Sequence, residues 1–186
     1  MTTAAPAAEL RRHLADWERV TDAPARLVGD SALRATTAVA SSPQARPRLG
    51  ELLVARRFIT EEQASTALNE ARSTGMLLGE VLLRQQLIFE DELARTLSTQ
   101  LSIPYISVMR VGIDPSVARL VPADVGERAC AIPVRMEEAG VLVAFADPTD
   151  PTALTAVEQH VPRFQLAVSE LSDIRLAWRR ARQRGA

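Results

Sequence analysis

The amino-acid sequence predicts an α+β protein, with an N-terminal helical subdomain of two repeated helical hairpins and a small α/β subdomain with a mainly antiparallel sheet. Three observations lead to this prediction. A stretch of 24 residues that begins at Arg48 recurs 29 residues later with the same order of apolar residues. After Pro104 the apolar residues form short runs typical of strands. Between those runs, Ser, Asp and Pro occur where a helix would begin, and this pattern indicates helices.

The first segment, residues 1–47, is expected to be an N-terminal helix and a flexible linker. Residues 7–20 place Leu10, Leu14 and Trp17 at helical spacing. The following residues are rich in Ala, Ser, Thr and Pro, which is typical of a linker, with a short helix expected near residues 32–38. The leading helix either docks on the body or a partner, or is a frayed tail, and both alternatives stay open.

The second segment, residues 48–103, contains the tandem repeat. Each copy predicts a short helix that begins with Leu-Gly, a turn, and a longer second helix. Thr60 and Gln63 form a capping-box pattern at the second helix of copy one, and Gly75 is expected to end that helix. The seven identical pairs of the two copies are Leu49/Leu78, Gly50/Gly79, Glu51/Glu80, Leu53/Leu82, Ile59/Ile88, Glu61/Glu90 and Leu68/Leu97.

The third segment, residues 104–186, predicts four strands and three helices, with the helices on one face of the sheet. Two apolar runs separated by a polar turn ending at Gly140 indicate a hairpin. Ser172 and Asp173 are expected to cap the last helix. The strands are expected at 105–108, 131–136, 141–146 and 164–169, and the helices at 115–120, 151–161 and 172–182.

Composition excludes several classes of function. With 22 arginines and no lysine against 23 acidic residues, the net charge of −1 argues against binding a nucleic acid polymer. The absence of lysine excludes a Walker A phosphate loop and a lysine Schiff base. One cysteine, Cys130, and two histidines, His13 and His160, provide neither a disulfide nor a zinc site. We therefore expect no metal and no cofactor.

Catalysis also has little support in the sequence. His13, His160 and Cys130 fit structural roles better than catalytic ones. Asp147 and Asp150 could form an acid/base or metal pair, but their place between a strand and Pro151 favours turn and N-cap chemistry. We therefore expect that the protein is not an enzyme.

No apolar run approaches the roughly 18 residues that cross a bilayer, and the first residues do not resemble a secretory signal. The expected location is cytoplasmic, without direct membrane insertion. Peripheral attachment at the inner membrane through a partner stays an open alternative.

The repeated Leu-Gly has two interpretations. Gly50 and Gly79 stand at expected helix starts, where free amides favour phosphate oxygens and glycine permits close approach. Arg48 adds a planar donor that can bond or stack on guanine, and the leucines of both copies could pack on bases. In the other interpretation Leu-Gly only allows close helix packing and the leucines are core. Composition and spacing alone favour the second interpretation.

The paired motif, which carries Arg48-Leu-Gly in copy one and Leu78-Gly79 in copy two, resembles the MshEN domain. This domain forms the N-terminus of type II secretion and type IV pilus assembly ATPases, and also occurs on bacterial glycosyltransferases. Ile103-Pro-Tyr105 and Ala146-Asp-Pro148 are similar to later parts of it. The resemblance implies binding of the bacterial second messenger cyclic di-GMP. It implies the ligand contacts Arg48, Leu49, Gly50, Leu53 and Leu68, then Leu78, Gly79, Leu82, Leu93, Leu97 and Gln100, with Asp147 as an acidic contact to guanine.

The sequence departs from the family pattern at five positions. The usual turn glycines are Arg57 and Gln86, a usual leucine is Ala64, the closing glutamine of copy one is Ala71, and a basic residue common at the start of copy two is Leu77. The loss of one apolar contact costs on the order of 1–2 kcal/mol. We expect these changes to weaken ligand binding.

Two functions follow. In the first, the protein is a non-enzymatic regulatory domain that binds cyclic di-GMP and controls a secretion, pilus or exopolysaccharide machine, which would supply its protein partner. In the second, it is a docking module of the secretion ATPase family that does not bind nucleotide, and its helical surface or the helix around Trp17 contacts another protein.

Overall fold

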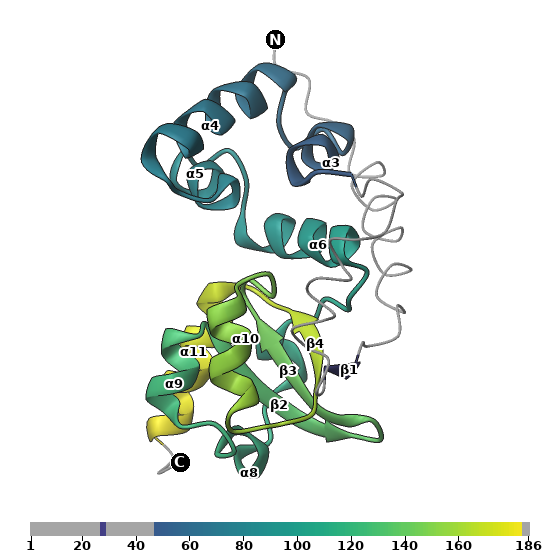
Figure 1. Cartoon of the computed structure of the whole chain (residues 1–186), viewed down its shortest axis with the longest axis vertical. Coiled ribbons are helices and arrows are strands. Elements are labelled where there is room, and N and C mark those ends of the chain that lie inside the picture. Colours follow the sequence, from purple (N-terminus) through teal and green to yellow (C-terminus); the bar gives the residue numbers. More distant parts are fainter. Residues whose placement is uncertain (1–26, 29–46, 184–186) are drawn as a thin grey trace.

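A computed structural model describes residues 27–28 and 47–183 (Figure 1). The expected helices at 7–20 and 32–38 lie outside the described residues, as does His13. The described chain has a helical part, drawn at the top of Figure 1, and an α/β part below it. This architecture confirms the predicted fold class.

The helical part consists of α3 (Leu49–Ala55), α4 (Glu61–Thr74), α5 (Leu78–Arg84) and α6 (Glu90–Leu101). These are the two predicted hairpins, each with a short helix followed by a longer one. Their apolar faces meet in one core, because neither hairpin alone can bury its leucines. The buried members of this core are Leu53, Ile59, Ala64, Ala67, Val81, Leu82 and Ile88.

The turns of the two hairpins have the same hydrogen bonds, so the repeat extends to the backbone. In copy one the amide of Phe58 donates to the carbonyl of Leu53 at 3.0 Å, and the amide of Arg57 donates to Val54 at 2.9 Å. Copy two repeats both bonds with residues 82–87. This pattern is the Schellman motif, in which the residue after the C-cap adopts a left-handed conformation. Arg57 has φ 61° and Gln86 has φ 56°.

We expect Arg57→Gly and Gln86→Gly each to stabilise the protein by about 0.5–1 kcal/mol. The left-handed conformation costs an L-residue roughly 1–2 kcal/mol, which exceeds the entropic cost of introducing glycine. Urea unfolding measures the change. Gly75, which ends α4 at φ 75° in open space, provides the reverse control, since Gly75→Ala should destabilise by about 1 kcal/mol. A destabilised Arg57→Gly would contradict this account of the turns.

At the start of each helix in the helical part, the side chain of the third residue accepts a hydrogen bond from the backbone amide of the N-cap. The predicted capping box of α4 is confirmed, because Thr60 and Gln63 exchange backbone-to-side-chain bonds at 2.8 and 3.1 Å. At α3, α5 and α6 the glutamate three residues after the N-cap accepts the N-cap amide, at 2.8, 3.0 and 2.8 Å. The first turns therefore follow one design in both copies.

The α/β part contains one mixed sheet with the strand order β1-β4-β3-β2. The hairpin of β2 and β3 is antiparallel, β3 and β4 are parallel, and β1 adds an antiparallel edge. The strands are β1 (Leu27–Val28), β2 (Ala131–Glu137), β3 (Gly140–Phe145) and β4 (Phe164–Val168), and the helices are α7 (Val108–Val111), α8 (Pro115–Ala118), α9 (Ala123–Arg128), α10 (Pro151–Glu158) and α11 (Leu171–Gln183).

Helices cover both faces of this sheet, so the expectation of helices on one face is wrong. Val141, Val143 and Phe145 of β3 pack in a core with α10, whereas Ala144 packs in a second core with Ile174 and other residues of α11. Successive side chains of a strand point to opposite faces, and nearly all of β3 is apolar. A strand buried on both faces is the physical reason for the second layer.

Two local expectations were also wrong, and one helix was not expected. Tyr105 forms only an isolated bridge with Val168, and the chain then enters α7 instead of a strand. α9 was not anticipated. The last helix begins at Leu171, and the amide of Ser172 donates at 2.8 Å to the carboxylate of Glu90 in α6. Asp173 instead accepts from the hydroxyl of Ser107 at 3.0 Å, next to the start of α7.

The helical and α/β parts meet through α6. Ala94 and Ile103 pack on Val168 of β4 in a small apolar cluster, which we call the junction cluster. Beside it, Arg95 lies over the ring of Tyr105, 4.2 Å from its centroid, and the phenol donates a hydrogen bond to Glu170. These contacts, with the bond from Ser172 to Glu90, fix α6 against the end of the sheet.

Candidate functional site

The structure brings the two Leu-Gly openings of the repeat together. A β-carbon built on Gly50 of α3 would lie 3.4 Å from the Cδ2 atom of Leu78, so the opening of copy two packs on the opening of copy one. A β-carbon on Gly79 would lie 3.0 Å from Leu93 of α6. Both glycines are buried, and both permit close approach of the next element. Four predicted contact residues, Gly50, Leu78, Gly79 and Leu93, therefore lie next to one another, and we call this row of residues the strip.

Gln100 connects the end of copy two with the start of copy one. Its Nε2 atom donates to the carbonyl of Pro47 at 3.2 Å, which is the residue directly before Arg48. Arg48 is exposed and is the N-cap of α3, where its side chain makes no capping bond. Arg48 therefore directly follows the residue whose carbonyl Gln100 contacts, and its side chain is exposed.

The predicted leucines differ in how much surface they expose. Leu53 and Leu82 are both 0% exposed and belong to the core between the hairpins, so they support the strip from beneath. Leu49 and Leu78 are half-buried, and Leu68 of α4 is 38% exposed. Spacing alone could not separate core leucines from surface leucines in this repeat.

Leu97 lies at the boundary between the two parts. It is half-buried and packs in the junction cluster with residues of β4, whereas Leu93, one turn earlier in α6, packs in the core between the hairpins. α6 therefore carries predicted ligand contacts and contacts to the sheet on the same helix. No signal in the sequence indicated this double role.

Asp147 follows β3 at the end of the sheet where the carboxyl ends of β3 and β4 lie near α6. β3 and β4 are parallel and pair Phe145 with Val168, so their carboxyl ends share one edge, and α11 starts there in contact with Glu90. The Asp147 carboxylate accepts from the amide and hydroxyl of Thr149 at 2.8 and 2.6 Å. This is the turn chemistry that the sequence favoured. Asp150 likewise caps α10 by accepting the amide of Thr152 at 2.8 Å.

The electrostatics of the junction are those of a structural contact. Burial and the hydrogen bond to Glu170 raise the pKa of Tyr105, so its phenol stays neutral and donates. Within the described ranges, no group of three His, Cys, Asp or Glu residues lies close enough to hold a metal ion. Nor does any described helix combine the length and apolarity that crossing a bilayer requires.

Two exposed apolar side chains in the helical part were not singled out for their exposure by the sequence. Leu77 is 57% exposed and Phe89 is 74% exposed, and each is the N-cap of the helix that follows it. Both occupy positions where copy one has a polar residue, Arg48 or Thr60. The two copies thus share a backbone but present different surfaces.

A family model described as the MshEN domain matches residues 101–186. The solved structure of MshE with cdg superimposes with a TM-score of 0.65 at 29% identity, and the match covers 73% of this chain and 99% of that chain. The solved N-terminal domain of XpsE gives a TM-score of 0.60 at 23% identity, covering 75% of this chain and 97% of that one, which is a likeness of fold.

Among curated proteins, the type IV pilus assembly ATPase PilB of Thermus thermophilus is 39% identical over 113 residues, which is 60% of this chain and 13% of PilB. The chain spans less than a fifth of the length of the curated relatives it matches. The family match to the α/β part and the likeness to MshE over both parts agree with the tandem motif. Residues 101–186 thus match the MshEN domain, and the fold of the described chain is similar to that of MshE.

Proposed function

We propose that this chain is a non-enzymatic regulatory domain that binds cyclic di-GMP through its tandem motif and controls a pilus, secretion or exopolysaccharide machine. The observation that carries the proposal is the meeting of the two Leu-Gly openings, Gly50 against Leu78, within a fold similar to MshE with cdg. We read cdg as cyclic di-GMP. A symmetric ligand with two guanines suits a site with two equivalent halves.

The chemistry of the strip and of the residues around it supports this ligand. Arg48 offers a charged planar donor that is free of capping bonds, and Gln100 offers an amide beside it. Half-buried Leu49, Leu78 and Leu93 offer apolar surface for the faces of the bases. The proposed site consists of Arg48, Leu49, Gly50, Leu68, Leu78, Gly79, Leu93, Leu97 and Gln100, supported by Leu53 and Leu82, with Asp147 at the facing edge of the sheet.

The proposed regulation passes through α6. A ligand that contacts Leu93 and Leu97 would favour one position of α6, and the bond between Glu90 and Ser172 would pass that position to α11. A ligand shifts such an equilibrium only by its difference in affinity for the two arrangements. We propose that a protein partner in the machine binds the two arrangements of α6 and α11 with different affinity. We also propose a cytoplasmic location.

Calorimetric titration of the whole chain with cyclic di-GMP tests the proposal. We expect saturable binding of one ligand per chain and, at a hundredfold excess over Kd, a rise in melting temperature of about 5 °C or more. Cyclic di-AMP serves as the matched control, since its bases lack the guanine O6 acceptor. No heat and no change in melting temperature at high micromolar cyclic di-GMP would exclude the function.

A second candidate function is protein docking without nucleotide. The exposed Phe89 and Leu77 favour it, because large exposed apolar side chains can contact the surface of another protein. It predicts that Phe89→Ser abolishes pull-down of a partner while Arg48→Ala has no effect on activity in the host cell. The reverse result for the two variants would exclude it.

A further inference from the structure

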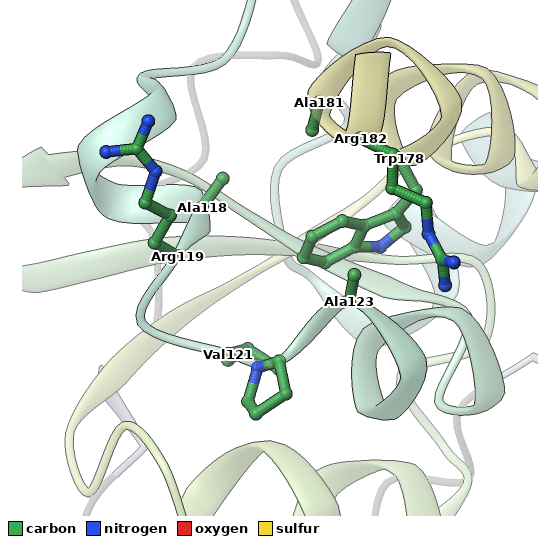
Figure 2. A pocket seen from close by; sticks show the side chains of 8 residues that line it. Ala118, Arg119, Val121, Ala123, Trp178, Ala181 and Arg182 are labelled. Carbon is green, nitrogen blue, oxygen red and sulfur yellow. The ribbon is translucent and has the colours of Figure 1, made fainter. Parts of the chain in front are cut away.

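A groove runs along the C-terminal half of α11, away from the tandem motif. Figure 2 shows its first cavity, about 110 Å³, with the Trp178 indole between Arg119 and Arg182. A second cavity, about 230 Å³, lies between α7 and α11. Ala181 lines both cavities, so they lie side by side on α11, and we call the two together the α11 groove. Along α11, Ala181 lies about 13 Å from Ser172, where the helix contacts α6.

The α11 groove has room for large apolar side chains. Its lining from α11 is small, since Ala177 and Ala181 face the cavities, and the indole of Trp178 forms apolar wall. Next to the lining residues in the sequence, Val111 is 50% exposed and Leu120 is 43% exposed. Two adjoining cavities of side-chain size suit two apolar residues one turn apart on a helix.

The charged residues that line the groove are arginines. Three arginines line the two cavities, Arg119, Arg180 and Arg182, and among the described residues no acidic one lines either cavity. Arg182 pairs with Glu127 at 2.7 Å. Within the described part of the chain, Arg119 and Arg180 form no ion pair, and Arg180 donates a hydrogen bond to the sulfur of Met109 at 3.8 Å. The rim therefore complements negative charge.

We propose that the α11 groove binds an acidic amphipathic helix of a partner protein, with two apolar residues in the cavities and carboxylates against Arg119 and Arg180. A flat anionic membrane would meet the arginines without filling the cavities, so the hollow favours a helix. This inference does not depend on ligand binding at the tandem motif, because the groove shares no residue with it.

The test uses the whole chain and a fluorescent synthetic helix with two leucines one turn apart, flanked by glutamates. Fluorescence anisotropy should show saturable binding that Arg119→Glu with Arg180→Glu weakens at least about tenfold, through lost attraction and added repulsion. The matched control, Arg72→Glu with Arg163→Glu, makes the same change in net charge at exposed residues outside the groove and should bind as the unmodified chain does.

Control peptides separate the two requirements. Replacing the leucines by alanine, or the glutamates by lysine, should abolish binding to the unmodified chain. The proposal is overturned by absence of binding at high micromolar protein, by equal weakening in both double variants, or by co-sedimentation with anionic phospholipid vesicles in place of peptide binding. Titration of the groove variants with cyclic di-GMP should match the unmodified chain, so failure here is distinguishable from failure of the proposed function.

Discussion

Gly126→Ala is expected to destabilise the protein by about 3 kcal/mol or more. A β-carbon on Gly126 would lie 2.7 Å from Cε2 of Trp178, closer still to Cζ2, and 2.9 Å from the carbonyl oxygen of Ala131. The indole is 2% exposed and its Nε1 donates to that same carbonyl at 2.9 Å. Overpacking costs about 1–3 kcal/mol, and a displaced indole leaves a buried carbonyl without its donor, which costs about as much again.

Urea unfolding followed by tryptophan fluorescence measures the loss in the free energy of unfolding. In a thermal scan, a loss of about 3 kcal/mol should lower the melting temperature by about 10 °C. Gly50→Ala is the matched control. Its β-carbon would meet Leu78 at 3.4 Å, an ordinary contact, and alanine is the better helix former. We expect its stability to lie within about 1 kcal/mol of the unmodified chain. A Gly126→Ala variant as stable as Gly50→Ala would show that α9 does not pack on α11 as described.

The contact between Gly126 and Trp178 illustrates which features of the fold the sequence could predict. Local signals gave correct boundaries: the Thr60 capping box, the stop at Gly75, and the prolines after Asp114 and Asp150 each act within a few residues. Features that depend on distant partners could not be predicted in this way. α11 is capped by Glu90, 82 residues away, and β1 is a strand only because it pairs with β4.

The candidate site shows the same division. The repeat predicted two similar hairpins, and the two Schellman turns confirm that similarity. It could not predict how the copies meet, because Gln100 contacts Pro47 across 53 residues. Nor could it separate core from surface, since Leu53 and Leu49 belong to the same motif yet only Leu53 is fully buried. Tertiary packing decides which residue of a repeated pattern remains accessible.

Arg48→Ala is expected to weaken cyclic di-GMP binding about ten- to hundredfold, since hydrogen bonds to charged groups contribute about 1.5–3 kcal/mol each. The fold should be unaffected, because the Arg48 side chain is exposed and caps nothing. Arg57→Ala removes another exposed arginine, at the opposite end of α3, and is the control for charge alone. Calorimetry with both variants decides the matter, and equal affinities for the two would remove Arg48 from the site.

Leu77→Arg should have the opposite effect and tighten binding about tenfold. Leu77 occupies in copy two the place that Arg48 has in copy one, and both residues are N-caps with nearly the same backbone angles, φ −72° and ψ 148° against φ −72° and ψ 151°. An arginine at 77 would therefore offer the second guanine the donor that copy two lacks, and it would replace a side chain that is 57% exposed. If Leu77→Arg leaves the affinity unchanged while Arg48→Ala lowers it, the two halves do not bind equivalent groups, and the ligand is not a symmetric dinucleotide.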